Sequence, residues 1–168
     1  MTPGRKRTHK RERVEEAVAV FRTPHVEGDV VARPCGKGKG KGVDLVATFT
    51  RFPKGTHGFH IHKAGDMRQK DCSGLCEHYD QGRRPHRHGP YRSRERHTGD
   101  LGNLTRGKAQ RKTLKRRYCL PTTRVQDLWG RSIIVHAGPD DLGKGGHEDS
   151  LTTGHSGARM ACAVFGRA

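Results

Sequence analysis

The chain has 168 residues, a length that suits one domain of typical size. Hydrophobic residues make up only 30% of the sequence, which argues against a large helical bundle and fits a small β domain with long loops. Lys and Arg number 34 against 17 Asp and Glu, so a formal charge of +17 attracts nucleic acids, anionic surfaces or small anionic substrates. No apolar run approaches the roughly 20 residues of a membrane-spanning helix, so we expect no membrane insertion. Five cysteines over this length exclude a disulfide-rich secreted scaffold.

The N-terminal segment, residues 1–13, holds six Lys or Arg and one Glu and has no hydrophobic period. This composition predicts a disordered, solvated tail, with an address signal or a nucleic-acid contact as alternatives. No apolar stretch follows the basic residues, so we expect no secretory signal peptide and a cytoplasmic protein. Residues 14–168 are assigned to a single domain.

Short β segments begin after the tail and are separated by polar loops. The expected strands cover residues 14–21, 28–31, 43–52, 57–62, 133–136 and 160–165. The clearest is 43–52, where apolar residues at every second position indicate a half-buried strand. Residues 65–102 and 138–157 are Gly-rich and polar, and loops of this length are usually functional. The pattern predicts an all-β fold, a Greek-key barrel or sandwich of about eight antiparallel strands with two long functional loops.

The histidines, twelve in all, raise the prospect of a metal site. His60 and His62 lie two residues apart in an expected strand, so both imidazoles face one side, although such pairs are most often plain surface residues. The long loop adds His78, His86, His88, His97 and Asp100. Three imidazoles and a carboxylate can hold zinc, but a basic, His-rich surface loop is an equal alternative. His136 ends a strand and is either structural or a further imidazole ligand of a copper-type redox site.

Four segments resemble the copper/zinc superoxide dismutase family, and they occur in that family's order and near its spacing. They are residues 58–66, 96–103, 135–146 and 153–162. The resemblance extends from about residue 14 to residue 168. The stretch 74–78 is also similar to the branch of this family found in large DNA viruses, which would place the protein in a virion or in host cytosol.

The resemblance implies a copper and a zinc ion held by shared ligands. The implied copper ligands are His60, His62, His78 and His136. The implied zinc ligands are His78, His88, His97 and Asp100, with His78 bridging both ions. His88 is preferred to His86 because its spacing of nine residues to His97 matches the family.

Further roles follow from the same resemblance. Asp140 matches the carboxylate that hydrogen-bonds one ligand of each metal, and His57 matches a structural histidine behind the copper strand. Arg159 matches the arginine that holds superoxide beside copper. Cys72 and Cys162 match the family's disulfide within one subunit.

Several positions depart from the family pattern. Cys76-Glu77 replaces a usual Gly-Pro, Asp80 replaces an Asn, and Thr152 stands where many members carry a guiding lysine. The resemblance assigns no role to three of the cysteines, which are Cys35, Cys76 and Cys119.

The implied activity is disproportionation of two superoxide ions to dioxygen and hydrogen peroxide by an oxidoreductase, with Arg159 and His78 as catalytic residues. His78 would leave copper on reduction, take up a proton and return it to the second superoxide. The resemblance also implies a homodimer. The alternative is a nucleic-acid- or polyanion-binding protein with a zinc-stabilised loop, since the tail, residues 83–96 and residues 106–117 are basic. Aromatic residues at only 5% argue against it. A metal-free or zinc-only scaffold is disfavoured because all four copper histidines are present.

Overall fold

The structure is a computed structural model that describes residues 15–35, 42–82, 86–107 and 113–168. The tail expected over residues 1–13 lies outside the described residues. Within the described residues, no helix is long and apolar enough to span a membrane.

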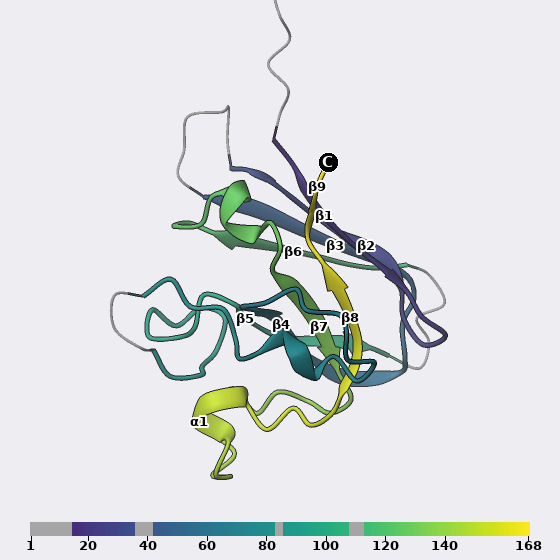
Figure 1. The fold of residues 1–168 in the computed structure, drawn as a ribbon. Coiled ribbons are helices and arrows are strands. Elements are labelled where there is room, and N and C mark those ends of the chain that lie inside the picture. Colours follow the sequence, from purple (N-terminus) through teal and green to yellow (C-terminus); the bar gives the residue numbers. More distant parts are fainter. Residues whose placement is uncertain (1–14, 36–41, 83–85, 108–112) are drawn as a thin grey trace, which may run out of the picture.

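Two antiparallel sheets pack face to face (Figure 1). The first has the strand order β6-β3-β2-β1-β9 and comprises β1 (Ala17–Arg22), β2 (Glu27–Pro34), β3 (Val43–Arg51), β6 (Leu114–Leu120) and β9 (Gly166–Arg167). The second has the order β5-β4-β7-β8 and comprises β4 (Gly55–His62), β5 (Asp100–Arg106), β7 (Ser132–His136) and β8 (Arg159–Val164). Three short helical turns complete the described elements, namely η1 (Ser73–Leu75), η2 (Val125–Leu128) and α1 (Ser150–Thr153). The predicted all-β Greek-key class is confirmed.

The core lies between the sheets and follows from strand alternation. In β3, Val43, Leu45, Ala47 and Phe49 are buried while the residues between them are partly exposed, as a strand with one covered face requires. The Phe49 ring lies against three other phenylalanine rings at centroid distances of 5.0 to 6.0 Å. Aromatic pairs at this spacing supply much of the apolar contact in a small core.

Strand β4 is the exception, because both of its faces are covered. Phe59 and Ile61 point into the core, and His60 and His62 on the opposite face are equally buried. What covers them is two long loops, one between β4 and β5 and one between β7 and β8, which lie beside the second sheet in the lower half of Figure 1. The fold therefore buries polar side chains outside the core, between the second sheet and the two loops.

Three strands, β5, β6 and the two-residue β9, were not expected from the sequence. Strand β5 begins at Asp100, within the region that reads as a loop, and β6 begins at Leu114, within the basic stretch 106–117, and extends beyond it to Leu120. Leu114, Tyr118 and Leu120 of β6 are buried, whereas the three basic residues after Leu114 are exposed. Strand β6 is at the edge of its sheet, where Lys and Arg commonly discourage pairing with other chains.

Candidate metal centre

Four imidazoles meet on the outer face of the second sheet. They are His60 and His62 of β4, His136 at the end of β7, and His78 in the loop that follows β4. A β-bridge between His62 and His78 fixes the start of that loop against the strand. One ligand atom from each of the four residues lies within 4.8 Å of the others, and all four side chains are buried.

Each of these imidazoles has one nitrogen aimed into the cluster without a partner. Among the described residues, His60 Nδ1, His62 Nε2, His78 Nε2 and His136 Nε2 are buried and make no hydrogen bond. The opposite nitrogens of His62 and His136 donate to the carbonyls of Cys76 and Gly157 at 2.9 and 3.1 Å. Since a carbonyl only accepts, these contacts leave the inward nitrogen of each ring with a free lone pair. Four convergent lone pairs that would be costly to bury alone fit a copper ion.

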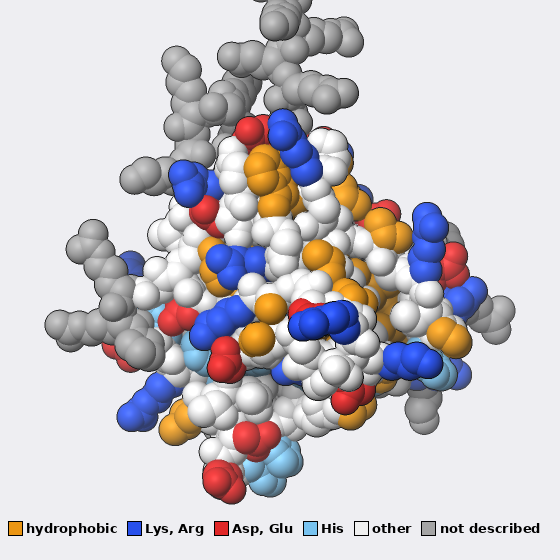
Figure 2. Space-filling view, in the orientation of Figure 1, with side chains coloured by type: hydrophobic (Ala, Val, Ile, Leu, Met, Phe, Trp, Pro, Cys, Tyr) orange, Lys and Arg blue, Asp and Glu red, His pale blue; other side chains and the backbone are white. Residues whose placement is uncertain are grey.

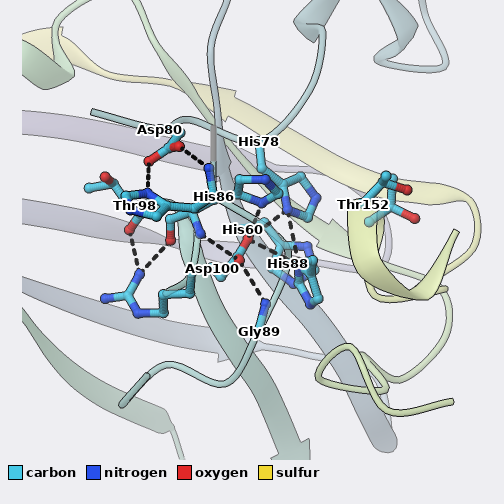
Figure 3. A network of polar contacts seen from close by, with 12 residues as sticks. His60, His78, Asp80, His86, His88, Gly89, Thr98, Asp100 and Thr152 are labelled. Carbon is cyan, nitrogen blue, oxygen red and sulfur yellow. Dashed lines mark hydrogen bonds and ion pairs between the residues drawn. The ribbon is translucent and has the colours of Figure 1, made fainter. Parts of the chain in front are cut away.

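A second cluster shares His78 and is organised by Asp100 (Figure 3). The Oδ1 atom of Asp100 lies 2.7 Å from His78 Nδ1, 3.0 Å from His88 Nδ1 and 3.3 Å from His97 Nδ1. Its Oδ2 accepts hydrogen bonds from the backbone N–H groups of Gly89 and His97. Three imidazoles and one carboxylate oxygen with ligand atoms within 4.8 Å of one another fit a tetrahedral zinc ion.

His86 lies outside both clusters. Its Nδ1 and its backbone N–H contact the carboxylate of Asp80 at 3.0 and 3.1 Å, beside the second cluster rather than in it (Figure 3). Asp80 also accepts from the N–H of Gly82. The carboxylate that replaces the family's Asn thus folds the loop back on itself.

Asp140 links the two clusters. Its Oδ2 lies 3.0 Å from His60 Nε2 and its Oδ1 lies 2.7 Å from His88 Nε2. Asn103 of β5 holds the backbone of Asp140 through two hydrogen bonds of 2.8 Å. His57 Nδ1 contacts the carbonyl of His136 at 3.0 Å and so ties β4 to the end of β7.

The protonation of the clusters suits metal ions. Burial lowers the pKa of His60 to about 3 and that of His136 to about 4, so both imidazoles are neutral at pH 7. Burial alone would raise the pKa of Asp100, but hydrogen bonds from His78, His88 and His97 hold it well below its usual value. Burial likewise opposes a charge on His88, yet Asp100 and Asp140 raise its pKa to about 9. The second cluster therefore favours a positive charge at its centre.

Arg159 lines a cavity of 1220 Å³ together with His62, His78 and His136. Its guanidinium donates to the carbonyls of Cys72 and Cys76 at 2.6 and 2.7 Å. The Cys76 carbonyl thus accepts from both Arg159 and the ring of His62.

The disulfide implied by the resemblance is present between Cys72 and Cys162. It ties the loop after β4, whose Cys72 carbonyl accepts a hydrogen bond from Arg159, to strand β8.

Some contacts carry no signal in the sequence. The backbone carbonyls of Cys76 and Gly157 orient the rings of His62 and His136, and a backbone carbonyl would do so whatever the side chain at its position. Thr152, at the position of the usual lysine, lines the cavity from α1 and stands apart from the histidines in Figure 3. Arg87 lines the same cavity, and its sequence position within a run of basic residues does not distinguish it from its neighbours.

Comparison with known proteins places the chain in one family. The family model for copper/zinc superoxide dismutase matches residues 26–165. The chain belongs to the copper/zinc superoxide dismutase family. It is 37% identical over 153 residues to "Superoxide dismutase [Cu-Zn] 2" of Brassica juncea, covering 90% of this chain and 97% of the relative. It is 44% identical over 115 residues to a Candida albicans copper/zinc superoxide dismutase, covering 68% and 73% of the two chains.

Among solved structures, the crystal structure of the clock protein EA4 matches with a TM-score of 0.77 and 27% identity, covering 99% of both chains. Family membership and the two histidine clusters together make this copper/zinc superoxide dismutase an oxidoreductase that disproportionates superoxide and uses copper and zinc.

Proposed function

We propose that each histidine cluster binds a particular metal and that the dismutation of superoxide takes place at the first. His60, His62, His78 and His136 would hold copper, and His78, His88, His97 and Asp100 would hold zinc. The observation that carries this assignment is the set of four buried, unpartnered imidazole nitrogens that converge among the described residues. His78 presents its Nε2 to one cluster and its Nδ1 to the other, which supports a bridging role.

The chain would contribute a proton relay at His78. Copper, when bound, supplies the one-electron redox chemistry that converts one superoxide to dioxygen and the other to peroxide. His78 carries a proton at Nε2 in one half of the cycle and releases it in the other. Its Nδ1, 2.7 Å from Asp100, stays in the zinc cluster, so the ring keeps its orientation while Nε2 changes state.

Arg159 would hold the anionic substrate. Its guanidinium is permanently charged, is fixed by backbone carbonyls and faces the cavity lined by the copper-site imidazoles. The acceptors that fix it are neutral carbonyls, so its charge is not cancelled by the contacts that position it.

Stopped-flow measurement of superoxide decay tests both assignments. Protein loaded with copper and zinc should consume superoxide rapidly, and the zinc-only form should not. Arg159→Glu should lower kcat/KM by about tenfold or more with both metals retained, since charge steering contributes roughly 10- to 1000-fold to such on-rates. The matched control, Arg22→Glu at the exposed end of β1, makes the same charge change outside the cavity and should have a small effect. Equal losses in the two variants would remove Arg159 from the mechanism.

Arg87 would supply the attraction that Thr152 cannot. Both residues line the copper-side cavity, but only Arg87 carries charge. Because the interaction is long-range, kcat/KM should fall with ionic strength, and Arg87→Gln should flatten that dependence. A slope equal to that of the unaltered protein would mean that the overall charge, not this residue, attracts the substrate.

A polyanion contact is a second proposed property, favoured by one observation. A separate cavity of 1040 Å³ is bordered by Arg92, Arg94, Arg96, Arg124 and Arg131. On the face in Figure 2, Lys and Arg side chains are interspersed with carboxylates, so the basic character of that face is spread out. A gel shift with random DNA should show binding that weakens with salt, and no binding near ~100 mM salt would exclude it.

We also propose a homodimer, as is common in this family, and a cytoplasmic location. Sedimentation equilibrium across a range of protein concentrations tests the first, and fractionation of the producing cells tests the second.

A further inference from the structure

A third group of metal-binding side chains lies on the first sheet, away from the histidine clusters. It consists of Cys35, directly after β2, Asp44 of β3 and Cys119 of β6. The two sulfur atoms are 3.6 Å apart, and a carboxylate oxygen of Asp44 lies within 4.8 Å of both. Cys119 is exposed and Cys35 is partly exposed, so solute ions can reach the group.

The three side chains are held by strand pairing rather than by a free loop. Asp44 is directly opposite Cys119 in the pairing of β3 with β6. On the other side of β3, the backbone N–H of Cys35 donates to the carbonyl of Gly42 at 3.0 Å. The hydroxyl of Tyr91 makes hydrogen bonds to both the N–H and the carbonyl of Cys119. The donors are therefore positioned before any ligand arrives.

This arrangement does not favour a disulfide between Cys35 and Cys119. Strand β3 lies between β2 and β6, and strands are spaced about 4.8 Å apart, so the two backbones are separated by roughly 9–10 Å. Disulfides usually need Cα atoms about 4.4–6.8 Å apart. Joining the sulfur atoms would require the chain at Cys35, just after β2, or strand β6 to move.

The same arrangement suits an ion placed between the sulfur atoms. Two thiolates at a zinc–sulfur distance of about 2.3 Å in a tetrahedral site lie roughly 3.8 Å apart, close to the 3.6 Å observed. Asp44 stands on the intervening strand and can supply the third ligand. Its Oδ2 already makes an ion pair with Arg117 at 2.5 Å. Two thiolates, a carboxylate and a divalent cation carry a net charge of −1, which the Arg117 guanidinium would balance.

We propose that Cys35, Asp44 and Cys119 form a third metal site, which binds zinc or another thiophilic divalent cation and leaves a fourth position for water. The bound ion would fasten the edge strand β6 to the end of β2 across β3. This site is independent of the proposed dismutase chemistry, because none of its residues touches either histidine cluster.

Cadmium titration tests the proposal on the full chain, loaded with copper and zinc and handled without oxygen, so that the free thiols stay unoxidised while the Cys72–Cys162 disulfide stays intact. Thiolate ligands give a sulfur-to-cadmium charge-transfer absorption in the ultraviolet, which ligation by histidine and carboxylate does not. We expect that absorption to saturate at one cadmium per chain. It should be lost in the double variant C35S/C119S and kept in C76S, which removes an exposed thiol elsewhere. Asp44→Asn should weaken binding by about tenfold or more, as even outer partners of metal ligands contribute that much.

Measuring superoxide decay on the same variants shows whether they remain folded and whether their histidine clusters remain active. C35S/C119S should retain full dismutase activity while losing the cadmium signal. Zinc should also protect Cys35 and Cys119, but not Cys76, from alkylation. Three results would each overturn the proposal: no charge-transfer absorption in the unaltered protein, an absorption that persists in C35S/C119S, or a mass loss of two hydrogens showing that Cys35 and Cys119 had formed a disulfide.

Discussion

Replacing Asp140 with Asn tests whether one carboxylate supports the metal clusters from behind. Asp140 is buried and accepts from His60, from His88 and from the backbone N–H of Leu142. An amide of the same shape has one oxygen, so one histidine would face an N–H₂ group with its own N–H. The buried negative charge that helps to raise the pKa of His88 to about 9 would also be lost. Since the cluster proposed to bind zinc contains His88, zinc affinity should fall more than copper affinity.

The expected loss of zinc affinity is about 10- to 100-fold, or about 1.4–2.7 kcal/mol, the range found for hydrogen-bond partners of metal ligands. Competition with a chromophoric chelator measures it for each metal separately. Asp141→Asn is the control, because it makes the same charge change at a neighbour that hydrogen-bonds Gly143 and Ser150 instead of a cluster histidine. Zinc affinity in Asp140→Asn within twofold of that control would refute the reasoning.

Two more substitutions probe the surroundings of the clusters. In Gly154→Ala the new Cβ would lie 2.3 Å from His88 Nε2 and from Asp140 Oδ1, so zinc affinity should fall. Gly146→Ala, at a similar positive φ but with no atom of the described residues within 4 Å of its Cβ, should leave zinc affinity unchanged. Cys72→Ser should lower the free energy of unfolding by about 4–5 kcal/mol in the chain-entropy model, given the separation of 90 residues. Urea denaturation measures that loss, and a change below about 1 kcal/mol would show that the disulfide constrains little.

The sequence predicted the strands in which side-chain alternation is regular and missed those in which function or edge position disturbs it. Strand β3 alternates throughout and was found. Strand β6 was missed because Arg116, on the same face as Leu114 and Tyr118, is exposed at the sheet edge and breaks the alternation. Strand β5 begins with Asp-Leu-Gly-Asn, in which Asp, Gly and Asn have low strand propensity. Asp100 hydrogen-bonds the second histidine cluster, and Asn103 hydrogen-bonds the backbone of Asp140.

For the site, spacing alone could indicate only the pair His60 and His62 and a His-rich loop. That His136 joins them depends on the pairing of β4 with β7, a long-range contact that no local pattern encodes. The family resemblance supplied this set before the fold was known. It could not supply the pairing of Cys35 with Cys119, because those positions have no counterpart in the family pattern and meet only through the order of strands in the first sheet.

Cys76 replaces a residue that is usually Gly in this family. The replacement leaves the cavity beside the first histidine cluster intact but costs stability. Its contribution to the cavity comes from its carbonyl, which holds His62 and Arg159, so the side chain is free to vary. Its backbone, at φ 60° and ψ −153°, lies in a region used almost only by Gly, where other residues cost about 1–3 kcal/mol.

Cys76→Gly restores the residue that the family usually has here. Gly relieves the backbone strain at this position, but its extra chain entropy in the unfolded state reduces the resulting gain in stability by about 0.5–1 kcal/mol. We therefore expect the free energy of unfolding to rise by about 0.5–2 kcal/mol, with superoxide decay unchanged. Cys76→Ser removes the same thiol without relieving the backbone and is the control. Equal stability of the two variants would show that the backbone strain at this position is negligible. The only role of the position would then be that of its carbonyl, which holds His62 and Arg159.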